Sequence, residues 1–595
     1  MTADFRHAVT GGLAGLEADI AAGRRANPEG APFYDELAAC IGAMRLWVER
    51  YRAELAKRLE ESPFFPRIAA ALTQVPERPP RDFFEAVQSL WLFWTFQRLA
   101  GNWSGLGRID ELLGPFLDAD LEAGRLDLGE AREILACFWI KGTEWITGRR
   151  VAGGDAQFYQ NVILAGTGRD GREVCNRVTM LIFDIVEELH ISDFPLGVRL
   201  SRKSPPPLLR RVAELQSRGG GIVSIYNEEV VIAALVKFGY PEKEACDFTN
   251  DGCWETLIPG ETAFSYCPFD ALQVWQDVFF ADCNYPDFES LFAAYSAALR
   301  RRLEQVCAGC SGSFNAPDRA APTPLLSLLM PSCIRSGRPY NRRGAKYNVV
   351  ALHAGGLPDV ANSFTAVRKL IYEDECCTLN ELRGILLRDF GGDERLRRMF
   401  ERCAVWYGND DEAADAMLAR VVSGFAAAAA EFRERDGLLH PAGISTFGRE
   451  VEFAPSRLAT PFGRRAHDYL SGNLAPSPGT DRNGPGAVVK SCCRNDFTQI
   501  PNGCPLDLRF DAAALASPSG VAMLEGLLKS FIGLGGYYLQ VDAVSREMLV
   551  DAKAHPERYP NLAVRISGWS ARFATLETAW QDMVIARSIQ EAEAG

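Results

Sequence analysis

Short apolar runs that alternate with amphipathic helical segments are the feature that most constrains the fold of this chain. Strand-like runs occupy 161–165, 197–200 and 221–225, and helical periodicity marks 178–189 and 207–218. Such alternation favours a parallel or mixed sheet that is covered by helices. We therefore expect an α/β fold for the middle of the chain.

The two ends of the chain differ from this middle part. Apolar residues recur at intervals of three and four over 37–48 and 84–94, so we expect the first hundred residues to be helical. The segment 441–506 is rich in proline and glycine and predicts ordered loops, which at this length usually serve a site. The remaining predicted elements are two strands and a last helix, 536–543, 561–566 and 576–590. The absence of a flexible linker indicates one large closed architecture.

The composition predicts a soluble globular protein of the cytoplasm. Apolar residues make up 47% of the chain and charged residues 24%. The net charge of −13 argues against nucleic acid or an anionic membrane as the main partner. The most aromatic run, 90–96, is far shorter than the roughly 20 residues of a membrane span, and we expect no signal peptide. The 16 cysteines are therefore expected to be reduced thiols rather than disulfides.

Two familiar site patterns are weak in this sequence. Gly166, Gly168 and Gly171 are spaced as in a dinucleotide-binding fingerprint after a predicted strand, although the residues between them favour a polar turn. Both interpretations stay open, and the first would imply an NAD-dependent dehydrogenase. Cys307 and Cys310 form a Cys-x-x-Cys pair without a second pair, and the six histidines are far apart, so no metal site is predicted.

Two segments join residue types that packing alone explains poorly. One places Glu255 two residues after Cys253, which would supply a reactive sulfur and a carboxyl group that moves a proton. A turn around a buried cysteine is the alternative explanation. In the other segment an apolar strand ends at Gly568 among small neighbours, which by itself predicts a tight turn with a positive φ angle.

Together these two segments resemble the signatures of glycyl radical enzymes, the pyruvate formate-lyase-like superfamily. The sequence Arg-Ile-Ser-Gly-Trp-Ser-Ala around Gly568 is similar to the family's Arg-Val-x-Gly-Tyr-Ser-Ala. The sequence Gly-Cys-Trp-Glu around Cys253 is similar to the Gly-Cys-Val-Glu of the dehydratase and C–X lyase branch. Further similar motifs follow in the family's order and extend the resemblance over nearly the whole chain: Phe84-Glu-Ala-Val-Gln88, Gly107-Arg108-Ile-Asp110, Gln160-Asn161, Val198-Arg199-Leu200, Asn227-Glu-Glu-Val230, Ala459-Thr-Pro461-Phe-Gly463-Arg464 and Ser477-Pro-Gly-Thr-Asp481-x-x-Gly-Pro485.

The resemblance implies a fold and a catalytic set. The fold is a ten-stranded α/β barrel of two five-stranded parallel half-sheets, surrounded by helices, with the thiyl and glycyl loops inside. Gly568 would hold the radical, because a glycine Cα has no side chain and can flatten between an amide nitrogen and a carbonyl. Cys253 would become the thiyl that abstracts hydrogen from the substrate, and Glu255 would be the acid/base group. Water and oxygen must be excluded from such intermediates.

The resemblance also implies partners and a division of the chain. It implies no dissociable cofactor and no metal, and a separate radical S-adenosylmethionine activase with an iron–sulfur cluster would install the radical. A homodimer is implied as well. We expect a helical region over 1–100 that packs on the barrel, a barrel core over 101–545 with the cysteine loop at 250–260, and a glycyl radical domain over 546–595.

The sequence departs from the family pattern in three places. The chain begins well inside the family's usual helical region, so we expect part of the pocket to be more open or covered differently. Asn102 and Cys267 stand where glycerol-type dehydratases carry a histidine and an acidic residue, which argues against a polyol substrate. Together with Tyr266 they are candidate substrate contacts. The bulky Trp254 is expected to reshape the pocket.

The predicted reaction is a radical elimination, a dehydration or other C–X cleavage, on a small substituted alcohol or acid. A decarboxylase of arylacetates also carries Cys-x-Glu and is the nearest alternative. Acyltransferases that release formate use adjacent cysteines at the tip, and anaerobic nucleotide reductases carry cysteines beyond the position of Cys504, so both fit less well. From another class, a non-catalytic scaffold paralogue remains an alternative.

Overall fold

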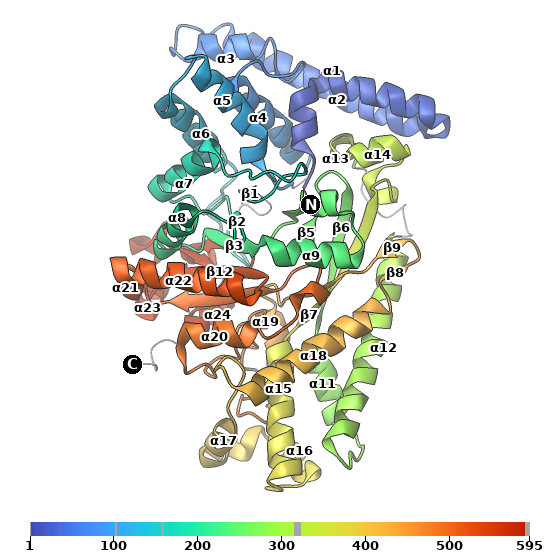
Figure 1. The fold of residues 1–595 in the computed structure, drawn as a ribbon, viewed down its shortest axis with the longest axis vertical. Coiled ribbons are helices and arrows are strands. Elements are labelled where there is room, and N and C mark those ends of the chain that lie inside the picture. Colours follow the sequence, from blue (N-terminus) through green and yellow to red (C-terminus); the bar gives the residue numbers. More distant parts are fainter. Residues whose placement is uncertain (1, 102–103, 156–159, 315–322, 589–595) are drawn as a thin grey trace.

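Two five-stranded sheets lie at the centre of the molecule and helices surround them (Figure 1). The computed structural model describes residues 2–101, 104–155, 160–314 and 323–588. This arrangement has the α/β class and the two five-stranded sheets that the sequence predicts. Strand directions differ from the expectation in both sheets, each of which contains one antiparallel pair and is therefore mixed rather than wholly parallel.

The first sheet joins strands from the middle and from the end of the chain. In spatial order its strands are β1 (Val162–Leu164), β2 (Leu196–Leu200), β3 (Val223–Asn227), β12 (Tyr538–Ala543) and β11 (Pro505–Phe510). The first three strands are parallel, with α7 (Arg177–Leu189) and α8 (Pro206–Ser217) as the crossovers between them. β12 pairs antiparallel with β3 and parallel with β11. Because no single crossover helix joins β3 to β12, the rule that makes such units parallel does not fix the direction of β12.

The second sheet is built around the long strand β7 (Tyr347–Gly355). β7 pairs in parallel with three strands, β6 (Thr262–Asp270), β9 (Leu438–Leu439) and β10 (Ala442–Ile444). The short β8 (Glu434–Arg435) runs antiparallel to β9. Four helices of this half of the molecule are α11 (Ala271–Phe279), α12 (Phe288–Phe314), α15 (Leu357–Val367) and α18 (Glu412–Ala430).

The helix α18 would be long and apolar enough to cross a membrane if length and composition alone decided. In the fold, 56% of the most apolar 18-residue stretch of this helix is buried, and the helix packs against α15 and α12. Its apolar character is therefore that of a core helix.

The first hundred residues are helical, as predicted, and their start lies next to the cysteine loop. The helices are α1 (Phe5–Ala26), α2 (Ala31–Leu55), α3 (Phe65–Ala71) and α4 (Phe83–Leu99). The hydroxyl of Thr2, just before α1, donates a hydrogen bond of 2.7 Å to the backbone carbonyl of Asn250. The N-terminal segment thus contacts the loop that carries Cys253.

The remaining helices surround these parts. They are α5 (Ile109–Glu122), α6 (Leu128–Lys141), α9 (Glu228–Phe238), α10 (Glu242–Ala245), α13 (Pro324–Leu328), α14 (Pro331–Ser336), α16 (Leu379–Leu387), α17 (Glu394–Glu401), α19 (Glu450–Phe453), α20 (Gly484–Cys492), α21 (Ala512–Leu515) and α22 (Pro518–Leu534). The stretch between β1 and α7 is a turn rather than a dinucleotide fingerprint. The N–H of Gly171 bonds to the carbonyl of Gly168, and no helix begins directly after the glycines, because the next helix is α7.

The C-terminal segment has an apolar core of its own. It consists of α23 (Arg546–Ala554), the antiparallel hairpin of β13 (Ala563–Arg565) and β14 (Ser570–Arg572), and α24 (Thr578–Ser588). Buried side chains such as Leu549 and Met583 form a cluster separate from the main core. The three-part division of the chain stays a prediction.

Candidate active site

A short hairpin fixes the backbone around Cys253. β4 (Thr249–Asn250) and β5 (Thr256–Leu257) pair antiparallel, and the N–H of Asp251 donates to the carbonyl of Glu255 at 2.8 Å. The side-chain amide of Asn250 donates to the carbonyl of Cys253 at 2.7 Å. These bonds hold the thiol at the tip of a rigid loop.

A second hairpin carries Gly568, and the side chain of Arg565 anchors it to the first sheet. Its guanidinium donates to the Oε1 of Gln540 at 2.7 Å and to the carbonyl of Gly221 at 2.8 Å. At the tip, the N–H of Ile566 bonds to the carbonyl of Trp569 at 3.0 Å. Gly568 lies within this closed tip.

The two tips meet at Gly568 and Cys253, residues that are 315 positions apart in the sequence. A Cβ atom added to Gly568 would overlap the Cα, the Cβ and the sulfur of Cys253. The backbone of Gly568 is also close enough to the thiol to lower its pKa, although burial has the larger, opposite effect. The φ angle of Gly568 lies outside the left-handed region, so the expected positive φ is wrong. Close approach to the thiol, rather than turn geometry, requires glycine here.

Glu255 points back toward the cysteine. Its Oε2 accepts hydrogen bonds from the N–H of Cys253 at 3.0 Å and from that of Trp254 at 3.1 Å. Burial raises the pKa of Glu255, while these N–H groups favour the carboxylate. Burial also raises the pKa of the Cys253 thiol well above its usual value, and the neighbouring Glu255 adds to this effect. The thiol therefore keeps its hydrogen, which a hydrogen-atom donor requires.

A cavity of about 320 Å³ opens onto Cys253 and Glu255. Its walls are aromatic, with a few charged groups among them. The rings are those of Tyr266, Phe447, Trp569 and Trp580, and the other charged side chains are Asp251, Arg449 and Glu452. The volume suits a small molecule. Trp254 does not line this cavity; it is fully buried and stacks behind Phe447, with ring centroids 5.1 Å apart.

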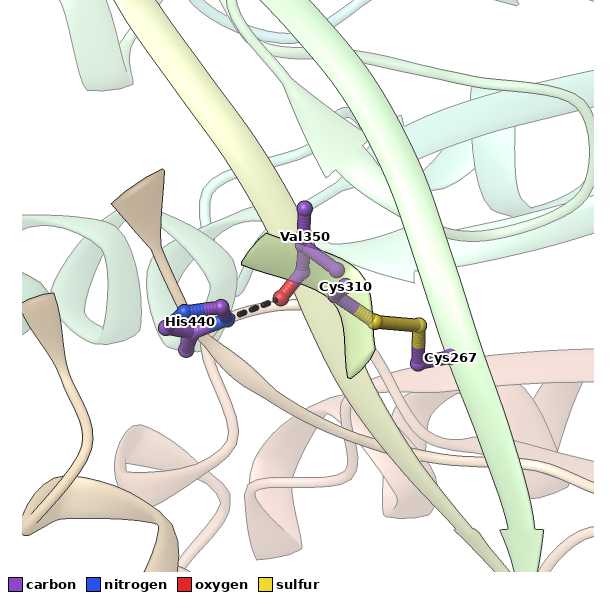
Figure 2. Close-up of a disulfide and its surroundings, with 4 residues drawn as sticks. All are labelled: Cys267, Cys310, Val350 and His440. Atoms are coloured by element: carbon purple, nitrogen blue, oxygen red, sulfur yellow. Dashed lines mark hydrogen bonds between the residues drawn. A yellow bond between two sulfur atoms is a disulfide. The ribbon is translucent and has the colours of Figure 1, made fainter. Parts of the chain in front are cut away.

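The three candidate substrate contacts have different positions. Tyr266 lines the cavity. Cys267 follows it on β6, where successive side chains point to opposite faces, and it does not line the cavity. Instead its sulfur is joined to that of Cys310 of α12 in a disulfide (Figure 2). Asn102 lies outside the described residues. The position of Tyr266 thus supports its role as a substrate contact, whereas the position of Cys267 does not.

The disulfide corrects the expectation that all cysteines are reduced thiols. It links residues 43 positions apart and connects β6 to α12. Beside it, the backbone carbonyl of Val350 is hydrogen-bonded to the ring of His440 (Figure 2). Sequence spacing cannot show this pairing, because only the fold brings β6 and the end of α12 together.

Sequence reasoning missed the charged and aromatic residues that the loop after β10 brings to the cavity. Phe447 and Gly448 both have positive φ angles, +54° and +72°, and this turn presents Phe447 and Arg449 to the cavity. A Cβ at Gly448 would lie 2.6 Å from the ring of Trp580, so glycine lets α24 pack against the turn. The available signal was the proline- and glycine-rich character of 441–506.

A buried histidine lies behind this wall. The ring of His353 on β7 is hydrogen-bonded to the hydroxyl of Ser445 at 2.9 Å and to the Oδ1 of Asn502 at 2.8 Å. Asn502 in turn donates to the carbonyl of Thr256, next to Glu255. Burial lowers the pKa of His353 to about 4, so the ring is neutral at neutral pH. The network connects the cavity wall to the cysteine hairpin.

Comparisons with known proteins agree with this site. The trans-4-hydroxy-L-proline dehydratase of Clostridioides difficile is 25% identical, over 93% of this chain and 74% of the relative. The isethionate sulfite-lyase of Nitratidesulfovibrio vulgaris is 28% identical, over 94% and 72%. A solved structure described for 1,2-propanediol dehydration in Roseburia inulinivorans superposes with a TM-score of 0.92 at 26% identity, and covers 99% of this chain and 79% of that one.

Family models match almost the entire chain. The model described as pyruvate formate lyase-like matches residues 1–454, and the glycine radical model matches residues 470–574, which include Gly568. With the two hairpin tips in contact, the chain belongs to the pyruvate formate lyase-like family of glycyl radical enzymes.

Proposed function

We propose that this chain catalyses a radical elimination, a dehydration or another C–X cleavage, in which Gly568 stores the radical and Cys253 and Glu255 act on the substrate. The single observation that carries the proposal is the contact between Gly568 and Cys253, beside a carboxyl group on the wall of a cavity. The relatives' names, a dehydratase and a sulfite-lyase, support the class of reaction.

Each step follows from these positions. The Gly568 radical takes the hydrogen atom of the Cys253 thiol, which leaves a thiyl radical. The thiyl abstracts a hydrogen atom from a substrate carbon that carries a hydroxyl or similar group. Glu255 takes the proton of that group, and the leaving group departs from the adjacent carbon with the bonding electron pair. The proton on Glu255 then passes to the leaving group, which restores the carboxylate. The product radical recovers a hydrogen atom from Cys253, which regenerates the thiyl and then the glycyl radical.

Partners belong to the same proposal. Installation of the radical at Gly568 calls for a radical S-adenosylmethionine activase with an iron–sulfur cluster, and no dissociable cofactor is required in this chain. We also propose a cytoplasmic homodimer, on the resemblance to the family alone.

Electron paramagnetic resonance tests the proposal. Anaerobic incubation with such an activase should give a glycine-type doublet, and Gly568→Ala should abolish it. The matched control is Gly526→Ala in α22, where an added Cβ meets no atom within 4 Å and the doublet should persist. Air exposure of the activated protein should release a C-terminal piece that begins at residue 568. A doublet that survives in Gly568→Ala would refute the assignment.

Product analysis separates the alternatives. An elimination yields a dehydrated or otherwise cleaved product, whereas an arylacetate decarboxylase would release carbon dioxide and keep the other groups. A scaffold paralogue would give no doublet and no product.

A further inference from the structure

The only basic side chain among the described residues of the cavity wall is Arg449. The other charged groups there, Asp251, Glu255 and Glu452, are acidic. A single guanidinium on the wall of a cavity whose other charged groups are acidic needs an explanation, because packing alone does not require a positive charge at this position.

The backbone holds Arg449 toward the cavity. It directly follows the two positive-φ residues Phe447 and Gly448 and precedes α19, whose first residue, Glu450, is fully buried and paired with Arg587 of α24. A non-glycine residue in the left-handed region is uncommon and is retained where the surroundings fix it. The side chain of Arg449 is 27% exposed, so it is partly shielded from water.

The neighbours of Arg449 leave part of its hydrogen-bonding capacity for a ligand. Its guanidinium lies beside two aromatic rings of the wall, 5.7 Å from the centroid of Tyr266 and 5.8 Å from that of Phe447. Glu452 is 3.5 Å away, but its side chain is 62% exposed, so this ion pair is weak. A guanidinium has five N–H donors in a planar fork that fits a carboxylate or a similar oxyanion.

We propose that Arg449 binds an oxyanion on the substrate, a carboxylate or a sulfonate, and so selects a small hydroxylated anion. This inference rests on the proposed function, since it assigns the other end of the molecule that reacts at Cys253. The rings of Tyr266 and Phe447 then cover the carbon chain between the anion and the reacting carbon, and the anion is held by Arg449 rather than beside Glu255.

Binding to the protein without its radical tests the assignment by calorimetry. The probes are 3-hydroxypropanoate, 2-hydroxyethanesulfonate, neutral propane-1,3-diol and cationic 3-aminopropan-1-ol. At least one anion should bind more tightly than the diol and the amine by about 10-fold or more, as expected of a charge-assisted contact. The preferred anion identifies the oxyanion as carboxylate or sulfonate.

Variants separate charge from packing. Arg449→Gln should remove the preference for the anion, and Arg449→Lys should keep part of it. Arg402→Gln, at an exposed position after α17, should keep all of it. Equal binding of anion and diol, tightest binding of the amine, absence of anion binding in the millimolar range, or a preference that survives in Arg449→Gln would each overturn the proposal. Because no radical is needed, these outcomes are independent of the resonance experiment.

Discussion

At the scale of single residues, contact geometry explains why the site uses these residue types. Glycine at 568 is required because any side chain would collide with Cys253. The same contact brings the Cα that would hold the radical next to the sulfur that would receive it. Glu255 is held by two backbone N–H groups, so its carboxyl group needs no other side chain to orient it.

Replacement of Glu255 by glutamine should separate radical storage from elimination. The amide oxygen of Glu255→Gln can still accept the two N–H bonds, so the glycyl doublet should form normally. The amide cannot take a proton, and turnover should fall by about 100-fold or more. Anaerobic assays with quantified radical content measure both quantities. Glu547→Gln, on the exposed face of α23, serves as the control, and full turnover in Glu255→Gln would contradict the acid/base role.

At the scale of elements, the position of the glycine hairpin depends on one buried arginine. Hydrogen bonds from Arg565 connect β13 to Gln540 in the first sheet and to the backbone at Gly221. Position 221 requires glycine, because a Cβ there would lie 2.5 Å from the Cβ of Arg565. Directional polar contacts of a buried side chain thus add to the apolar contacts that hold this segment.

Arg565→Lys should weaken this docking while it keeps the charge. Lysine cannot reproduce the guanidinium's several simultaneous bonds, so the free energy of unfolding should fall by roughly 2–4 kcal/mol. The radical yield should fall with it. Thermal unfolding and quantified resonance spectra measure the two effects. Arg558→Lys, at a site 61% exposed in the same segment, should change neither, and an unchanged melting temperature in Arg565→Lys would contradict the anchoring role.

At the scale of the whole molecule, buried titratable groups make stability depend on pH. Burial lowers the pKa of His353 from 6.5 to about 4. Between pH 6.5 and pH 4 the histidine is therefore protonated in the unfolded chain and neutral in the folded protein. The stability that the neutral ring contributes is present above pH 6.5 and is lost as the pH falls toward 4. Buried Asp270 and Asp507, whose pKa values burial raises to about 6, act in the opposite sense, since their contribution falls as the pH rises from 3.8 to 6.

Comparison with His353→Gln isolates the imidazole from these carboxyl groups. Between pH 7.5 and pH 4.5 the native sequence should lose up to roughly 3 kcal/mol more stability than the variant, because the variant lacks the histidine while both proteins share the carboxyl groups. Denaturant unfolding at both pH values gives the two differences. Parallel losses in both proteins would show that His353 does not carry this pH dependence.

Much of the architecture was predictable from the sequence, as was the choice of the candidate reacting residues, whereas the pocket was not. Apolar runs identified β2, β3 and β12, because buried strands must be apolar whatever their partners are. Motif similarity identified Cys253, Glu255 and Gly568. Arg449 and Trp580 come from a loop and from a distant helix, and nothing local marks them as neighbours. The same holds for the bond between Cys267 and Cys310.

The separate apolar core of the C-terminal segment has a consequence for access. Hydrogen bonds to Gln540 and Gly221 can be exchanged for bonds to water, whereas apolar packing cannot. Because most of its apolar contacts are internal, the segment would keep much of its packing if it moved as a unit. If Gly568 holds the radical as we propose, such a movement would let one piece of chain shield the unpaired electron in one position and expose its backbone in the other.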